Sequence, residues 1–238
     1  MARGRLLLGA TCLAGCASAA AVAAAGPPPI GVLGGLPKLP AGKPGTVSVV
    51  AQGAYGQYSP GTVLPVVIRN ATTKAVSGLY VTGTALSPKG HALADGQDEG
   101  VQPAVVAPGG LALAFVRFGG SLPAGTRFRL TVAETPAGLD TGYSSPTDMP
   151  LSGLRYLLGQ LTGTGTNTTR RKVYKTFDVF AACFDRSGAL VAFGKTFGKK
   201  AEAAPGQKVP FTLVFGRRGS PPVCAHVLVS MIAQSQPI

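Results

Sequence analysis

The 238-residue sequence contains few side chains suited to acid–base or metal chemistry: two histidines and nine acidic residues, against 22 lysines and arginines. The histidines, His91 and His226, stand alone in their segments. The chain has no Gly-x-Ser-x-Gly, His-Glu-x-x-His or Cys-x-x-Cys motif, which are spacings typical of nucleophilic hydrolases and of metal or redox sites. We therefore expect no catalytic residue, no metal site and no cofactor, and a protein that is not an enzyme.

One acidic group is visible, formed by Asp95, Asp98 and Glu99 in a segment flanked by glycines. Carboxylates in such a loop can bind Ca²⁺ weakly through their oxygen atoms. Aspartate and glycine also favour plain surface turns. We expect a solvated surface loop here rather than a cation site.

Four cysteines occur, at positions 12, 16, 183 and 224. Cys183 and Cys224 are the two that a globular part would keep after processing of the N-terminus. A pair of this kind in an exported chain predicts a disulfide. The alternative is two free thiols that pack as small apolar side chains.

Residues 1–25 have the layout of a secretory signal peptide, with Arg3 and Arg5 before an apolar, alanine-rich stretch. Three processing routes fit it. Residues 13–16 read Leu-Ala-Gly-Cys, which resembles a bacterial lipobox and would make Cys16 a lipidated mature N-terminus. Residues 23–25 fit ordinary signal peptidase, and an uncleaved segment of about 20 apolar residues could span a bilayer. The sequence predicts an exported protein: a cell-envelope lipoprotein, or a secreted or periplasmic one.

Residues 26–45 are rich in proline and glycine. Proline lacks a backbone N–H and is excluded from helix interiors and central strands. A chain of this composition is a semi-rigid, polyproline-like spacer of about 3 Å per residue. We expect either a tether that holds the folded part away from a membrane or a disordered exported N-terminus with no role.

The rest of the chain contains an internal repeat. Asn70 and Asn167 each begin an Asn-x-Thr turn, and Pro108-Gly109 recurs as Pro205-Gly206; both pairs are separated by 97 residues. Such self-similarity predicts a duplicated unit.

Each copy is expected to form short strands separated by turn signals. In the first copy we expect strands at 63–70, 76–86, 101–106, 111–118 and 128–133. In the second copy we expect strands at 156–162, 173–184, 190–197, 209–215 and 224–232. The only segment with a weak helical pattern is 152–161, which two glycines disfavour. The predicted fold is all-β: two tandem immunoglobulin-like β-sandwich modules, at residues 46–150 and 151–238.

The turn and core pattern of the second copy resembles the FxLYD-type and CARDB-like immunoglobulin-fold modules of bacterial exported proteins. The resemblance rests on Cys183-Phe184-Asp185-Arg186-Ser187-Gly188, on Leu190-Val191, on Pro205-Gly206 and on Phe211. The first copy departs from it at residues 86–90, and Ala181 and Cys183 replace two apolar positions of the motif. The resemblance covers roughly 60–135 and 156–233 and implies a non-catalytic module with no assigned ligand.

The positive charge is concentrated in the second module. Residues 46–150 hold six basic and six acidic residues, whereas residues 151–238 hold twelve basic and three acidic ones. Clustered cations attract anionic partners at long range. The candidate anionic-ligand patch consists of Arg170, Arg171, Lys172, Lys175, Lys199, Lys200, Arg217 and Arg218.

These features predict a non-catalytic binding or adhesion-type protein of the cell envelope, which presents its basic module to an anionic envelope component or to a protein partner. The alternative is a structural spacer or an assembly accessory that acts by strand pairing at a sheet edge. We do not expect nucleic acid as the partner, because the phenylalanines alternate with apolar residues as core positions do.

Overall fold

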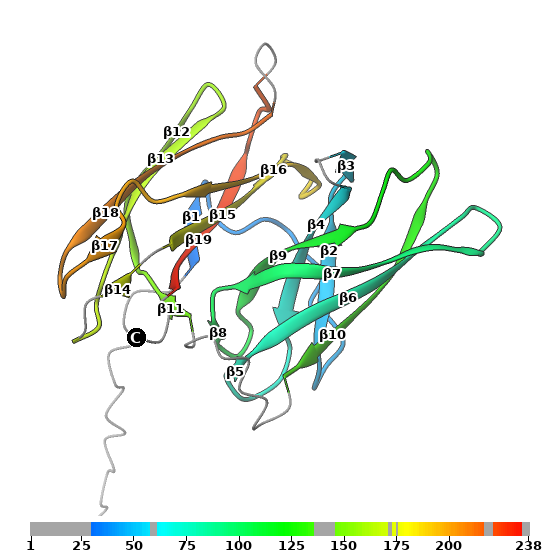
Figure 1. The fold of residues 1–238 in the computed structure, drawn as a ribbon, viewed down its shortest axis with the longest axis horizontal. Coiled ribbons are helices and arrows are strands. Elements are labelled where there is room, and N and C mark those ends of the chain that lie inside the picture. The colour runs from blue at the N-terminus through cyan, green and yellow to red at the C-terminus, as the bar shows by residue number, and fades with distance from the viewer. Residues whose placement is uncertain are drawn as a thin grey trace, which may run out of the picture.

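The computed structural model describes residues 30–57, 61–135, 146–170, 173–174, 176–216 and 221–234. Within these ranges the chain forms 19 strands and no helix (Figure 1). The high content of glycine, proline and β-branched residues disfavours helices and favours strands joined by turns. The all-β prediction is confirmed.

The first half of the chain builds one large sheet. Its strands follow the order β10-β6-β7-β9-β4-β2, β3 pairs with β4, and β5 pairs separately with β8. Their bounds are Val47–Gln52 (β2), Gly56–Gln57 (β3), Thr62–Asn70 (β4), Val76–Ser77 (β5), Leu79–Leu86 (β6), Ala92–Gln102 (β7), Val105–Val106 (β8), Leu111–Phe118 (β9) and Arg127–Glu134 (β10).

The second half builds two main sheets, and the N-terminal strand β1 joins one of them. The strand orders are β1-β19-β15-β16 and β12-β13-β18. In addition, β11 pairs with β19 and β14 pairs with β17. The bounds are Ile30–Leu33 (β1), Thr147–Asp148 (β11), Leu151–Leu157 (β12), Gln160–Thr166 (β13), Val173–Tyr174 (β14), Thr176–Phe184 (β15), Leu190–Phe197 (β16), Glu202–Ala203 (β17), Lys208–Val214 (β18) and His226–Gln234 (β19).

The two halves repeat one strand order, as the predicted duplication requires. Strands β2-β4-β9 correspond to β12-β13-β18, and β10-β6-β7 correspond to β19-β15-β16. The small pairs correspond as well, since Val76 faces Val106 and Val173 faces Ala203. One difference is that β7 and β9 are paired in the first half, whereas β16 and β18 lie in separate sheets.

Both copies of the Asn-x-Thr turn have the same hydrogen bonds. The buried Asn70 side chain donates to the Val106 carbonyl at 2.9 Å and accepts from the Thr72 hydroxyl at 2.7 Å. The buried Asn167 side chain donates to the Ala203 carbonyl at 2.9 Å and accepts from the Thr169 hydroxyl at 2.7 Å.

The Pro-Gly turn closes each corner through the asparagine backbone. The amides of Gly109 and Gly206 donate to the carbonyls of Asn70 and Asn167, both at 2.7 Å. These glycines have φ angles of 71° and 74°, a region that favours glycine. The asparagine and the glycine therefore recur together because each corner needs both.

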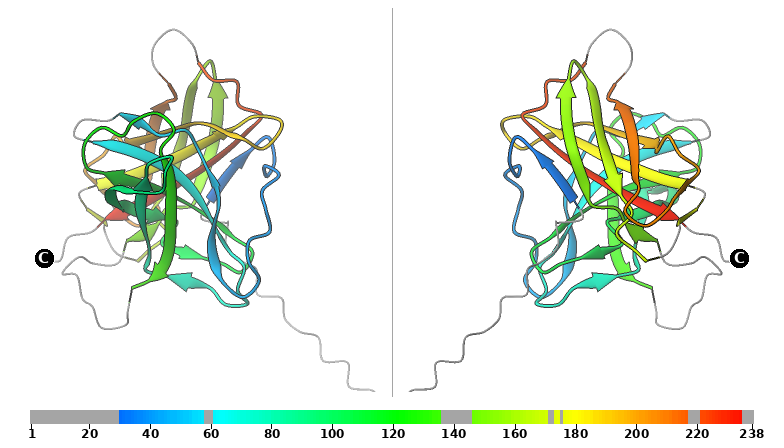
Figure 2. Two further views of the ribbon diagram at one scale, coloured as in Figure 1. Left: turned by 90° about the vertical axis from the view of Figure 1, so that its right-hand side faces the viewer. Right: turned by 90° about the vertical axis from the view of Figure 1, so that its left-hand side faces the viewer.

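A shared apolar core joins the halves. The face of β4 and β9 that carries Val67, Leu113 and Phe115 packs against the face of β15 and β19 that carries Phe180 and Leu228. The opposite face of β15 points into the second half's own core. The sheets are stacked in layers, and Figures 1 and 2 show the β15–β19 sheet beside β4 and β9.

The tether prediction for residues 26–45 differs from the structure at 30–33, where β1 lies at the edge of a sheet and pairs with β19. This stretch, Ile-Gly-Val-Leu, contains no proline and can supply backbone donors. Gly31 fits because an added Cβ would lie 2.5 Å from the Leu154 side chain. Residues 1–25, with the predicted signal peptide and Cys16, lie outside the described residues.

Two further expectations were wrong. The acidic segment with Asp95 and Asp98 is part of strand β7 rather than a loop. Gly96 is needed there because an added Cβ would lie 2.7 Å from the Phe118 ring. The expected single strand at 156–162 is a hairpin that turns at Leu158 and Gly159.

The corners predict matched stability effects. Asn70→Ala and Asn167→Ala each leave buried backbone groups without partners, so each should lower the free energy of unfolding by about 3 kcal/mol. Because both halves share one core, urea unfolding followed by circular dichroism should remain a single transition in each variant. Thr73→Ala, at an exposed position beside the first corner, is the control. Two separate transitions would contradict the shared core.

Candidate functional site

The described residues contain no group of three or more histidine, cysteine or acidic side chains placed to hold a metal ion. His91 is exposed in a turn. His226 Nδ1 donates to the Gly34 carbonyl at 2.7 Å, which fastens the chain after β1 to the start of β19. Neither histidine belongs to a group of possible metal ligands among the residues that the structure describes.

The carboxylates of Asp98 and Glu99 on β7 form their contacts within the first-half sheet. Asp98 is largely buried and accepts from the backbone amides of Val81 and Gly100. Burial raises the pKa of the Asp98 carboxyl, and these two hydrogen bonds oppose the rise. Glu99 forms an ion pair with Arg117 at 2.5 Å. These contacts explain the acidic residues without a bound cation.

The outer face of β6, β7, β9 and β10 holds an open, polar cavity of about 460 Å³. Hydroxyl, amide, carboxylate and guanidinium groups surround it. Its lining residues are Thr82, Gly83, Thr84, Asp95, Gly96, Gln97, Arg117, Arg129 and Thr131. Positive and negative groups are mixed here, so this cavity does not select for an anion.

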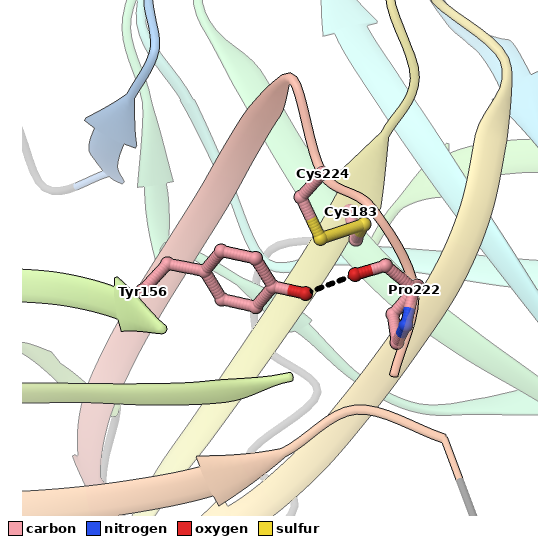
Figure 3. The surroundings of a disulfide bond; sticks show 4 residues. All are labelled: Tyr156, Cys183, Pro222 and Cys224. Atoms are coloured by element: carbon pink, nitrogen blue, oxygen red, sulfur yellow. Dashed lines mark hydrogen bonds between the residues drawn. A yellow bond between two sulfur atoms is a disulfide. The ribbon is translucent and has the colours of Figure 1, made fainter. Parts of the chain in front are cut away.

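The predicted Cys183–Cys224 disulfide is present in the structure, with the two Cα atoms 5.3 Å apart. Cys183 lies in the second-half core, and Cys224 precedes β19. Beside the bond, the Tyr156 hydroxyl donates to the Pro222 carbonyl (Figure 3). The disulfide thus fastens the segment before β19 to the end of β15, and the Tyr156 hydrogen bond ties the same segment to the end of β12.

Three of the eight predicted patch residues lie within the described ranges. Arg170 and Lys199 are exposed and Lys200 is half-buried. Arg170 follows the Asn167 corner, and the Lys199 amide donates to the Pro210 carbonyl near the start of β18. These two segments therefore flank the same end of the second half. The other predicted patch residues, Arg171, Lys172, Lys175, Arg217 and Arg218, lie outside the described residues.

The second half offers few negative charges to balance its cations. Asp178 is buried and accepts from Gln234 Nε2 at 2.7 Å. Asp185 accepts from Ser187 and Ala189 in its own turn, and the Ser187 hydrogen bond lowers the pKa of its carboxyl. The exposed basic residues described in this half are Arg155, Arg170, Arg186, Lys195, Lys199 and Lys208.

An exposed apolar group at the β12–β13 turn was missed by the sequence analysis. It consists of Leu157, Leu158, Val214 and Val223, with exposed fractions of 71%, 81%, 61% and 87%. We call it the apolar tip. Leu158 has a φ of +47°, a conformation that costs a non-glycine residue about 1–2 kcal/mol. The adjacent Leu-Leu-Gly sequence was the only available signal, since a glycine can close a two-residue turn.

Comparisons with known proteins do not assign the chain to a family. No protein-family model matches the chain. A search of curated proteins also found no significant match. Among the residues that the structure describes, no helix is long and apolar enough to cross a membrane.

The buried Asp178 predicts a pH-dependent stability. Burial raises the pKa of its carboxyl, Lys195 opposes the rise and Glu99 adds to it. A carboxyl whose pKa is raised by folding favours the folded state at low pH, and this contribution is lost as pH rises through the folded pKa. Asp178→Asn should therefore match the parent near pH 4 and be the more stable protein near pH 7, in urea unfolding at both values. A variant that is less stable near pH 7 would contradict this.

The disulfide closes a loop between residues 41 apart in sequence. Chain entropy predicts that Cys183→Ala with Cys224→Ala lowers the free energy of unfolding by about 4 kcal/mol. Thermal unfolding of the parent with and without a reductant should give a loss of similar size. The double variant should not respond to the reductant.

Proposed function

We propose that this chain is an exported, non-catalytic binding protein of the cell envelope, and that its second half presents cations to an anionic partner. The observation that carries the proposal is the excess of exposed cations on that half. None of Arg155, Arg170, Lys199 and Lys208 forms an ion pair with another described residue. Unpaired surface cations raise the local concentration of anions and speed their association.

The second half has three acidic residues in the sequence, too few to offset its twelve basic ones. Asp178 is buried within the second half, and Asp185 is bonded to its own turn. The balanced first half packs on the opposite side of the β15–β19 sheet, through the shared apolar core. This arrangement supports a rigid body with one neutral and one basic part.

An immunoglobulin-like architecture fits the repeated strand order. In each half, two groups of three strands enclose an apolar core, and in the first half the pairing of β7 with β9 joins the two groups into one sheet. A small separate pair of strands lies at each asparagine corner. Many cell-surface domains share this sandwich architecture, and their functions reside in sites on its surface. The duplicated architecture therefore favours a binding role over catalysis.

A second candidate function is pairing at a sheet edge. β1 already adds to the edge of β19, which shows that this chain accepts an extra strand there. In the first half β10 is an end strand of its sheet, with β6 as its paired neighbour. A partner strand could add to β10 through backbone hydrogen bonds.

The anionic-partner proposal predicts a salt-dependent interaction with heparin, used as a soluble polyanion. The variant Arg170→Gln/Lys199→Gln/Lys200→Gln should elute from a heparin column at lower salt than the parent. In binding titrations, the slope of log affinity against log salt should fall by about 3, because fewer counterions are released.

The matched control removes three exposed lysines outside the second half, as Lys43→Gln/Lys74→Gln/Lys89→Gln. It has the same change in net charge and should elute close to the parent. An equal loss in both variants would overturn the proposal. A protein partner that stays bound at about 0.5 M salt, where charge interactions are screened, would instead favour sheet-edge pairing.

A further inference from the structure

The apolar tip is the most exposed apolar group of the part of the chain that the structure describes. Val223, Leu158 and Leu157 have the three largest exposed fractions among its large apolar side chains. Figure 1 shows the β12–β13 hairpin projecting from the second half. An exposed apolar cluster on a projecting turn is typical of a contact surface.

The tip residues come together through strand pairing. Leu157 faces Gln160 across the hairpin, and Gln160 faces Val214 on β18. Directly paired residues point to the same side of a sheet, so Leu157 and Val214 share the outer face. The inner face carries Leu161 and Leu213, which belong to the core.

The backbone at the tip is unfavourable for the residue that occupies it. Leu158 and Gly159 have φ angles of 47° and 79°, as in a two-residue turn that favours Asn-Gly. Leucine at the first position is strained, and its side chain remains largely in water. Neither property stabilises the fold, so both point to a contact outside the chain.

The structure beneath the tip is firmly held. Gly159 is buried, and its carbonyl accepts from the Phe215 amide at 2.8 Å. An added Cβ on Gly159 would lie 2.6 Å from Pro221. The Tyr156 hydroxyl and the disulfide at Cys224 fix the neighbouring segment (Figure 3). The leucines are thus presented from a rigid base.

A positive charge beside the tip favours an apolar partner that also carries negative charge. Arg155 is exposed on the same face as Leu157, two residues earlier on β12. Arg170 and Lys199 lie at the other end of β13 and β18, so Arg155 is the cation that these strands place beside the tip. Apolar side chains at a projecting turn beside a cation match an anionic lipid surface, where the headgroups attract the cation and the acyl region takes the leucines.

We propose that the apolar tip inserts into the interface of an anionic lipid bilayer and docks the second half on it. This inference goes beyond the proposed function, because the tip lies at the end of β13 and β18 opposite to the Asn167 corner that carries Arg170 and Lys199. Leu157 and Leu158 enter the acyl boundary, and Arg155 lies at the level of the headgroups.

The absence of tryptophan from the sequence allows a direct test. Leu158→Trp places a single fluorophore at the tip of the full chain. Its emission should shift to the blue on addition of vesicles made of phosphatidylglycerol and phosphatidylcholine, and vesicles of phosphatidylcholine alone should give little shift. Leu93→Trp, at an exposed apolar position of the first half, is the matched control and should not shift.

A second variant separates insertion from folding. Leu158→Asn relieves the backbone strain, so it should raise the unfolding temperature by about 3 °C. The same change should weaken binding to the anionic vesicles on the order of tenfold, because one apolar side chain no longer enters the lipid. Its elution from heparin should be that of the parent, since the cations are unchanged.

The outcomes distinguish the two proposals. No blue shift of Leu158→Trp on anionic vesicles, with heparin binding intact, would overturn the lipid inference alone. A blue shift without vesicles that grows with protein concentration would overturn it in favour of docking to a second copy. Loss of the heparin difference between the two triple variants would instead overturn the proposed function.

Discussion

The contact between Phe115 and Phe180 lies within the layer on which the rest of the architecture depends. Their ring centroids are 4.5 Å apart, one ring coming from each half of the chain. Both faces of the β15 sheet are therefore buried, one against its own half and one against the first. Two copies joined by a flexible linker would leave this face exposed, so burial of apolar area favours one rigid body.

Within this body, the two halves share their corners and differ at their edges. Asn70 and Asn167 keep the same hydrogen bonds because a buried corner needs an amide that both donates and accepts. The edge strands differ in their pairing: β19 has β1 and β11 as additional neighbours, whereas the corresponding strand β10 pairs with β6 alone. Charge has diverged as well, which gives the halves different capacities for binding.

The sequence predicted elements that local patterning determines. The bounds of β9 and β16 match the expected strands, because apolar runs there end at clear turn signals. Strand β7 was missed because its glycines and aspartates are poor strand formers. Packing against Phe118 explains Gly96, and hydrogen bonds within the sheet explain Asp98. The apolar tip was missed because Leu157 and Leu158 looked like the interior of a strand, and a positive φ cannot be read from composition.

The pairing of β1 with β19 has a consequence for how the protein matures. Ile30 faces Ser230, so the first strand of the fold must wait for the last one to be made. Contacts between residues so distant in sequence form slowly, because the entropy cost of closing a long loop comes before the contacts can stabilise the fold. A chain that leaves the ribosome or a translocon N-terminus first would keep β1 without its partner until β19 emerges, so this pair would form only after the strands between them have been made.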